Sequence, residues 1–545
     1  MQHIDIIKLY QSKRCLIVED LPEARASLKN MLNTFGLDKI DTAATSQQAV
    51  ELCEEKHYDL LLCDYNLGEG QDGQQLLEEL RFRKLLRNTS MFVMVTAERS
   101  RDMVLGALEF QPDDYLTKPV TQALLQQRLT RFIMRHEDLL PIKQAIDEQN
   151  YIQAIELCNE KLWGKGKYPS SYLKLKGELL LQMKRFGETK TLYENALQKQ
   201  QTVWAQLGLG KTLLLLKKHD QAKTMLMHII DEDERYVEAH DLLTDLYEEQ
   251  AEFEKAQTAM ERAVSISPKS VLRQRRLAAL ARKNEDRRRS LKARKAALKT
   301  GEHSCHHLAQ DYFDVVDELI LDDSDSATKA RQLQDCSMYL KRAEKKHSGH
   351  SIIIQAAAAR ARLAQRQGDL ATAQKYLEKA KTLHIDGKQT APYAELELAL
   401  AMRACNEAEE ANELLANIAK NNPHHEDLSI RIDALCDEPI SQMGKEIASK
   451  LNRQGIDFFD KTAYDDALEV FIRASHLFPR HPGLRLNIVQ VALDKFKTEE
   501  SNNAETAKLI KDGLLALREL SIEHEQYPRY QHLKKQALKL DIDNL

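Results

Sequence analysis

Three short apolar runs, each ending in polar side chains, constrain how the first quarter of the chain can fold. Asp59–Asp64 is the clearest of them, and Cys15–Asp20 and Met91–Thr96 follow the same pattern. Apolar runs of this length are typical of strands that are buried on both faces of a parallel sheet. Because ligands bind at the carboxyl ends of such strands, we expect Asp64 to lie in a functional site.

A fourth run, Asp114–Pro119, places a lysine directly before a proline. If the four runs share one parallel sheet, their ends bring like charges together, and these repel one another unless a cation or a proton is present. Mg²⁺ suits a site with two or three oxygen ligands and room for water and a phosphoryl oxygen. The ends of the runs offer three acids, a hydroxyl and an amine: Glu19, Asp20, Asp64, Thr96 and Lys118.

An acidic pair, an aspartate, a threonine and a Lys-Pro pair, in this order, resemble the receiver domain of two-component response regulators. The resemblance covers about the first quarter of the chain. It implies that Asp64 accepts a phosphoryl group from a sensor histidine kinase, a phosphotransfer protein or a small phosphodonor. It also implies a Mg²⁺ site whose ligands are Glu19, Asp20, Asp64 and the carbonyl of Asn66.

The same resemblance assigns three residues that would respond to the phosphoryl group. Thr96 would bond a phosphoryl oxygen, and Lys118 would pair with the phosphate charge. Tyr115 occupies the position of the family's aromatic switch residue. Phosphorylation adds charge and acceptor oxygens, so loops that carry such groups can move. The small side chain of Ala97 leaves space for the phosphoryl group, and the bond before Pro119 is a candidate for the cis form.

Strands alternate with helices in this part of the chain, which predicts a doubly wound α/β domain over residues 12–136. The resemblance implies a five-stranded parallel sheet in the flavodoxin-like order. The second strand is expected at 38–42. Helices are expected at residues 22–36, 47–57, 73–86, 101–110 and 120–135, where apolar positions follow a helical period.

An internal repeat dominates the remaining sequence. The repeat has three marked positions. It begins with a small residue, continues with an apolar or aromatic residue four positions later, and ends with a small or apolar residue three positions after that. Successive copies start 33 or 34 residues apart. This is the tetratricopeptide period. Small residues also recur twelve positions earlier, where two helices must pack closely. The starting residues are Thr189, Ala222, Ala256 and Ser290, and the preceding small residues are Gly177, Gly210, Thr244 and Ala278.

Further copies of the pattern extend the array in both directions. Ala154 precedes it, Ala373 begins a further copy, Ala411 begins a weaker one, and the clearest copy runs from Gly455 to Pro479. The chain therefore resembles tetratricopeptide-repeat proteins from residue 139 onward. We expect an all-α solenoid in three segments, 139–300, 301–435 (irregular) and 440–540, with a groove suited to peptides or partner helices.

Two polar stretches suggest other chemistry. Arg273–Lys299 is strongly basic, but it lacks aromatic residues for base stacking, and the acidic stretch Asp311–Asp325 follows it. We expect it to be a solvated or partner-facing surface rather than a nucleic-acid site. His303–His307 contains Cys305 and three histidines, but a zinc site needs about four ligands and no second pair is evident, so we interpret it as a surface cluster.

The composition argues for a cytoplasmic protein that acts by binding. The net charge is −5, and eight cysteines lack paired spacing. No signal segment opens the chain and no apolar stretch is long enough to span a membrane. We find no P-loop, Gly-x-Ser-x-Gly or His-Glu-x-x-His motif, no helix-turn-helix and no cyclic-dinucleotide enzyme motif, so we expect the protein not to be an enzyme.

These observations predict a bacterial two-component response regulator. Mg²⁺-dependent phosphorylation of Asp64 would gate protein binding by the repeat array, which would act as an adaptor or inhibitor of a partner signalling protein. Two alternatives stay open: a nucleic-acid-binding regulator that uses residues 273–299, and a phosphate sink that drains a kinase. A homodimer is compatible with each of them.

Overall fold

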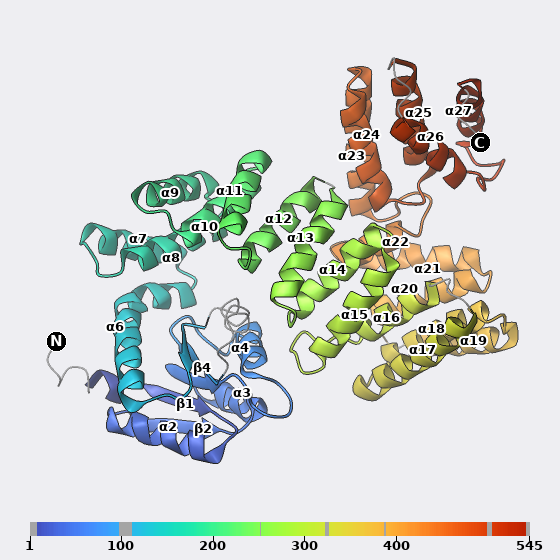
Figure 1. Ribbon diagram of the computed structural model, residues 1–545. Coiled ribbons are helices and arrows are strands. Elements are labelled where there is room, and N and C mark those ends of the chain that lie inside the picture. Colours follow the sequence, from blue (N-terminus) through green and yellow to red (C-terminus); the bar gives the residue numbers. More distant parts are fainter. Residues whose placement is uncertain are drawn as a thin grey trace. The chain divides into compact units, whose positions relative to one another are not determined.

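The computed structural model describes residues 8–97, 112–250, 252–321, 326–385, 389–498 and 504–540. The chain divides into two compact units, Met1–Asp311 and Tyr312–Leu545. The first unit contains an α/β domain followed by helices, and the second is helical throughout its described residues (Figure 1). The helix expected at 101–110 lies outside the described residues.

The α/β domain is built on a five-stranded parallel sheet in the order β2-β1-β3-β4-β5. This confirms the doubly wound architecture and the flavodoxin-like strand order. Every residue of β3 and β4 is buried, which explains why their sequences are apolar up to the polar last residues, Asp64 and Thr96. The strands are β1 (Arg14–Val18), β2 (Lys39–Ala43), β3 (Leu60–Asp64), β4 (Met91–Thr96) and β5 (Asp114–Thr117).

Helices cover both faces of this sheet and form two separate cores. Side chains at their N-termini cap three of them: Thr45 accepts from the Gln48 amide, Asp72 forms a capping box with Gln75, and Thr121 accepts from the Leu124 amide. The third helix ends earlier than predicted, because Lys84 adopts a left-handed conformation with φ 57°. The helices are α2 (Pro22–Thr34), α3 (Ser46–Glu55), α4 (Gly73–Phe82) and α6 (Gln122–Asp147).

Helix α6 is much longer than the predicted helix 120–135, and it connects the α/β domain to the repeats without a break. Its first half, including Leu125 and Ile133, packs in the core of the α/β domain. Its second half, including Leu139 and Ile142, packs in the core of the first helical repeat. The expected boundary between residues 136 and 139 thus falls inside one helix.

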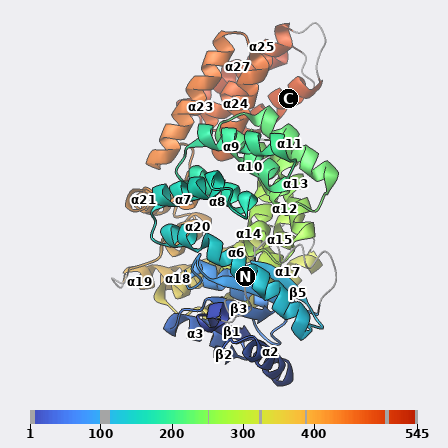
Figure 2. The same cartoon turned by 90° about the vertical axis from the view of Figure 1, so that its left-hand side faces the viewer.

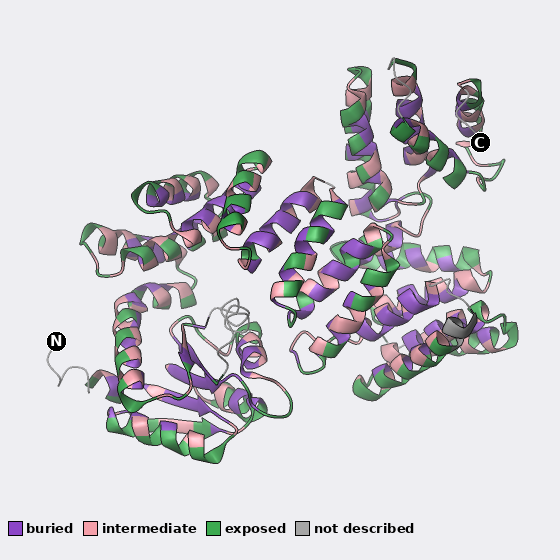
Figure 3. Cartoon of the chain, viewed as in Figure 1, coloured by how far each residue is buried: buried purple, intermediate pink, exposed green. Residues whose placement is uncertain are grey.

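The rest of the first unit is a row of helix pairs. Consecutive helices lie side by side in both views (Figure 1 and Figure 2). Each has one buried and one exposed face, as expected for stacked amphipathic helices (Figure 3). The helices are α7 (Tyr151–Trp163), α8 (Pro169–Gln182), α9 (Phe186–Lys199), α10 (Val203–Leu215), α11 (His219–Glu232), α12 (Val237–Glu249), α13 (Phe253–Ile266), α14 (Val271–Lys283) and α15 (Arg287–Gly301).

A left-handed residue marks the turn inside the helix pairs and confirms the predicted register. Lys184 and Lys217, both with φ 58°, each lie five residues before a starting residue of the repeat, Thr189 and Ala222 respectively. Non-glycine residues rarely adopt this conformation, so its recurrence at one phase shows a repeated turn. The same offset holds for Gln149, Glu285, Gly368, Asn406 and Thr462, which precede Ala154, Ser290, Ala373, Ala411 and Ala467.

The second unit continues with the same kind of helices, and two of its cores lie among the described residues. One core spans residues 354–432 and the other spans residues 448–537. The helices are α16 (Gln310–Leu321), α17 (Ser326–Lys346), α18 (His350–Arg366), α19 (Leu370–Ile385), α20 (Pro392–Ala404), α21 (Ala408–Asn421), α22 (Glu426–Asp433), α23 (Gln442–Asp460), α24 (Tyr464–Leu477), α25 (Pro482–Thr498), α26 (Ala504–Ala516) and α27 (Tyr527–Lys539).

The ring of Tyr193 packs against two glycines of neighbouring helices, Gly177 and Gly208. A Cβ atom added to Gly208 would lie 2.3 Å from Cζ of Tyr193. We expect Gly208→Ala to destabilise the first unit by about 1–3 kcal/mol, since overpacking outweighs the better helix propensity of alanine. Thermal unfolding followed by tryptophan fluorescence would measure this, because Trp204 packs edge-on against Tyr193 with ring centroids 6.1 Å apart.

The matched control is Gly187→Ala in α9, where an added Cβ would meet nothing within 4 Å. This variant should be as stable as the parent or slightly more stable. Equal stability of the Gly187 and Gly208 variants would show that Tyr193 can repack and that the glycine at 208 is not required.

Candidate functional site

The acids at the ends of β1 and β3 meet at one edge of the sheet. Glu19 and Asp20 directly follow β1, and Asp64 is the last residue of β3. One carboxylate oxygen of each residue lies within 4.8 Å of the others. Glu19 is fully buried and Asp64 is 7% exposed, whereas Asp20 is partly open to solvent. The structure therefore gathers the three predicted acids into one cluster.

Lys118 joins this cluster from the end of β5. Its Nζ donates hydrogen bonds to Oε2 of Glu19 at 2.8 Å and to Oδ2 of Asp64 at 2.9 Å. The peptide bond between Lys118 and Pro119 is cis, as the resemblance implied. Burial opposes the charged form of Lys118, but its bonds to the two carboxylates outweigh this and raise its pKa. Burial also raises the pKa of Glu19.

The cluster fits a hard divalent cation. Oε1 of Glu19 is buried and accepts no hydrogen bond from the residues that the structure describes. An unsatisfied buried carboxylate oxygen is costly, and a cation beside Asp20 and Asp64 would satisfy it. Asn66 follows β3 and is exposed; its side chain accepts from the Gly68 amide at 3.3 Å. The assignment of its carbonyl as a Mg²⁺ ligand stays a prediction.

The two predicted switch residues lie on adjacent strands. Thr96, the last residue of β4, is buried and pairs in register with Thr117 of β5. Tyr115 pairs in register with Met94 and packs, partly buried, against the core beneath α4. The amide of Lys118 donates to the carbonyl of Thr96 at 2.6 Å, so the hydroxyl position and the lysine are tied to each other through the backbone.

Gly73, which sequence reasoning did not single out, allows α4 to begin against the phosphoacceptor strand. A Cβ atom at this position would lie 2.2 Å from the backbone oxygen of Asp64. The Gly73 amide donates to the carbonyl of Tyr65 at 2.8 Å. A glycine directly after the helix cap Asp72 is the sequence signal for this close approach.

A lysine of the repeats contacts the same segment. Lys269 lies between α13 and α14, and its Nζ donates to Tyr65 Oη at 3.0 Å and to Asp72 Oδ2 at 2.7 Å. The ammonium also lies 5.0 Å from the centre of the Tyr65 ring. Burial would lower the pKa of Lys269, but these bonds raise it. Sequence patterns did not indicate this contact, because it joins residues about 200 positions apart.

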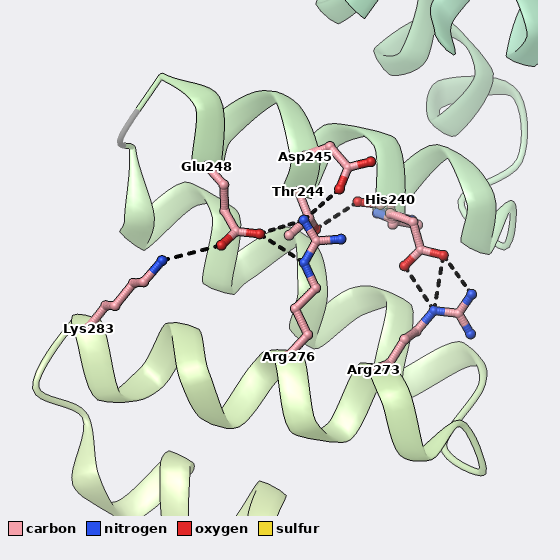
Figure 4. Close-up of polar contacts among 8 residues, drawn as sticks. His240, Thr244, Asp245, Glu248, Arg273, Arg276 and Lys283 are labelled. Atoms are coloured by element: carbon pink, nitrogen blue, oxygen red, sulfur yellow. Dashed lines mark hydrogen bonds and ion pairs between the residues drawn. The ribbon is translucent and has the colours of Figure 1, made fainter. Parts of the chain in front are cut away.

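Cations in the first half of the basic stretch that suggested nucleic-acid binding pair with acids of the array. Arg273 of α14 forms a forked ion pair with Asp241 of α12, with nitrogen–oxygen distances from 2.6 to 3.1 Å. Arg276 pairs with Asp245 and Glu248, as Figure 4 shows. Lys283 reaches the same Glu248 at 3.5 Å. These three cations bind acids of α12, which argues against the nucleic-acid alternative for the α14 half of the stretch.

Comparisons with known proteins agree with this geometry. The family model "Response regulator receiver domain" matches residues 15–130, and "Tetratricopeptide repeat" matches residues 237–270. The chain is 28% identical to chemotaxis protein CheY-3 of Vibrio cholerae over 127 residues, which cover 23% of this chain and 96% of that protein. It is 29% identical to CheY of Pseudomonas aeruginosa over 122 residues, with 22% and 97% covered.

Among solved structures, the chain is similar to a CheY-like receiver domain protein from Methanospirillum hungatei, with 28% identity, a TM-score of 0.21 and coverage of 23% of this chain and 96% of that one. The sequence matches define the class of the N-terminal domain: it is a CheY-like receiver. The chain therefore contains a response regulator receiver domain, and a tetratricopeptide repeat lies in the helical region that follows it. In the part of the chain that the structure describes, no helix could cross a membrane.

We expect Asp20→Asn to weaken Mg²⁺ binding at least about tenfold, because it removes one charge from a cluster of three carboxylates. Isothermal titration of the full chain with Mg²⁺ would measure the change. Asp41→Asn is the control, since Asp41 lies on β2 and is bound by Tyr58 and Lys56. An equal loss in both variants would contradict the assignment of the ion to the cluster.

Proposed function

We propose that Asp64 accepts a phosphoryl group from a sensor histidine kinase or a phosphotransfer protein, and that this gates protein binding by the repeats. The output is binding to a partner signalling protein in the cytoplasm rather than catalysis by this chain. The observation that carries the proposal is the contact of Lys269, a repeat residue, with both Tyr65 and Asp72, which flank the phosphoacceptor segment.

Each residue of the cluster has a role in the transfer. A carboxylate oxygen of Asp64 attacks phosphorus, the bond to the donor nitrogen breaks, and an acyl phosphate forms on Asp64. Mg²⁺ held by Glu19, Asp20 and Asp64 would neutralise charge on the phosphoryl oxygens. Lys118 holds the acceptor carboxylate in place before transfer and pairs with the phosphoryl charge afterwards.

The added charge then acts on neighbouring groups. A phosphoryl group brings new acceptor oxygens next to Thr96, whose hydroxyl can donate to one of them. If Thr96 turns toward the phosphoryl group, it leaves space behind it, and Tyr115 on the adjacent strand would move in response. On the other side, Tyr65 directly follows Asp64 and Asp72 caps α4, so any shift of this segment changes the two bonds that Lys269 makes.

A groove in the last repeats supplies a surface for the partner. Its volume is about 640 Å³, and α23, α25 and α27 line it. Arg529 lies in this groove and donates to the side-chain oxygens of Asn487 and Gln490 at 2.7 Å. Within the described residues it forms no ion pair with an acid. A half-buried guanidinium held by amides suits a carboxylate, so we propose an acidic segment of the partner as the occupant.

To test gating, the full chain would be used to capture partners from native cytoplasm. The capture would be run with and without Mg²⁺ and beryllofluoride, which mimics the phosphoryl group on Asp64. We expect the parent protein to change its capture of a partner when beryllofluoride is added. Lys269→Met should still be phosphorylated at Asp64, but its capture should no longer respond, because the link between Asp72 and the repeats is lost.

Lys255→Met is the control for this experiment, because Lys255 is exposed on α13 and pairs with Glu252 of the same repeat. It should respond like the parent protein. A Lys269 variant with a full response would refute this route between the domains. A partner whose capture ignores beryllofluoride in the parent protein would favour the phosphate-sink alternative.

A further inference from the structure

Three metal-ligating side chains meet where α4 of the receiver approaches the segment that follows α15. Glu78 comes from α4, and Cys305 and His306 come from the segment after α15. One ligand atom of each lies within 4.8 Å of the others. Cys305 and His306 are both partly buried, and the third side chain comes from the receiver, so the sequence 303–307 alone did not reveal this group.

The spacing of the nitrogen and oxygen atoms suits a shared ion. Nε2 of His306 lies 3.2 Å from Oε1 of Glu78, and the two side chains are only 16% and 15% exposed. Tetrahedral bonds to zinc of about 2.0–2.2 Å place a nitrogen and an oxygen ligand about 3.3 Å apart. A Zn²⁺ ion could therefore bind Nε2 of His306 and Oε1 of Glu78 with little movement of either side chain.

The chemistry of the three ligands selects the kind of ion. Thiolate, imidazole and carboxylate are the usual ligands of Zn²⁺, and three of them leave one position for water or a fourth group. Mg²⁺ and Ca²⁺ prefer oxygen ligands alone and would not use Cys305.

Neighbouring groups hold the ligands in place. The Ser304 hydroxyl lies 3.5 Å from the second carboxylate oxygen of Glu78. Arg275 donates to the backbone oxygen of His306 and forms a forked pair with Asp311 at 2.7 Å, which anchors the segment. The ring of Phe82 packs edge-on against His306, with centroids 5.2 Å apart. Such outer contacts orient the ligands of metal sites.

We propose that Glu78, Cys305 and His306 bind one Zn²⁺ ion and thereby tie helix α4 of the receiver to the repeats. This site is separate from the acidic cluster that is predicted to hold Mg²⁺, and its existence does not depend on phosphorylation of Asp64. Because Asp72 and Glu78 belong to the cap and body of one helix, a bound ion would also restrain the segment that Lys269 contacts.

Titration of the metal-free, reduced full chain with Co²⁺, in excess Mg²⁺, tests the proposal. We expect one Co²⁺ per chain to produce a thiolate-to-cobalt charge-transfer band in the near ultraviolet, and Zn²⁺ to displace it. Cys305→Ser should abolish the band. His306→Gln and Glu78→Gln should weaken Co²⁺ binding at least about tenfold. Circular dichroism of the metal-free variants would establish that they are folded.

Two controls make the outcome specific. Cys53→Ser removes a partly buried thiol of the receiver, and His303→Gln removes an exposed histidine near the site; both should bind Co²⁺ like the parent protein. Asp64→Asn should also leave the band unchanged, which separates this proposal from the phosphorylation proposal. A band that survives Cys305→Ser, or Co²⁺ affinity that is unchanged in Glu78→Gln, would overturn the bridging site.

Discussion

Asp64→Asn is expected to abolish phosphorylation of the chain. The asparagine amide lacks the carboxylate oxygen that attacks phosphorus, so no acyl phosphate can form. The substitution preserves the size of the side chain and should leave the fold intact, although Lys118 loses one charged acceptor and keeps Glu19. Incubation with a small phosphodonor and Mg²⁺, followed by intact-mass spectrometry, should show incorporation reduced at least about a hundredfold.

The same strand offers a control. Asp59 precedes the opposite end of β3, where its carboxylate accepts from the Arg14 amide at 2.8 Å. Asp59→Asn should incorporate the phosphoryl group at the level of the parent protein. Phosphate that persists in Asp64→Asn would locate the acceptor elsewhere and would remove the basis for gating by this site.

Arg362→Met is expected to cause the largest loss of stability in the second unit, about 3–5 kcal/mol. The guanidinium donates to Asp317 and Glu397 at 2.7 Å each, and the side chains of Arg362 and Glu397 are both 10% exposed. Without the arginine, two carboxylates would stay close together in a buried site. Hydrogen exchange of α18 and α20 at neutral pH would measure the lost protection.

The pH dependence of this variant follows from the pKa of Glu397. Burial already raises this pKa in the parent protein, while Arg362 lowers it. In Arg362→Met the folded-state pKa should rise further above the unfolded value. The folded state then binds a proton more tightly than the unfolded state. The loss of stability in Arg362→Met should therefore shrink as the pH falls through the folded-state pKa toward the unfolded value.

Arg360→Met serves as the control, because Arg360 lies on the same helix and pairs with Glu344 at a more open site, where the side chains are 20% and 30% exposed. Its loss should not exceed about 1 kcal/mol. A deficit in Arg362→Met that is no larger than in the control, or one that does not change with pH, would contradict the buried-cluster explanation.

The position of the candidate site was predictable because it depends on local patterns. Apolar runs mark the buried strands, and parallel strands necessarily end at one edge, which is where Glu19 and Asp64 meet. The register of the repeats was equally accessible, because small residues recur at a fixed spacing in the sequence. Left-handed residues such as Lys184 and Lys217 lie five positions before two of these small residues. Helix boundaries were less accurate, because the end of α4 depends on the left-handed conformation of Lys84.

The sequence by itself determined the parallel receiver sheet, the acidic cluster at its edge and the repeat register, because each of these arises from periodicity within a few residues to a few tens of residues. Only the tertiary structure decided that Lys269 contacts Asp72, that Glu78 lies beside His306, and that Arg276 of α14 pairs with Asp245 of α12. These contacts join side chains that are distant in the chain, and their partners depend on how whole helices pack.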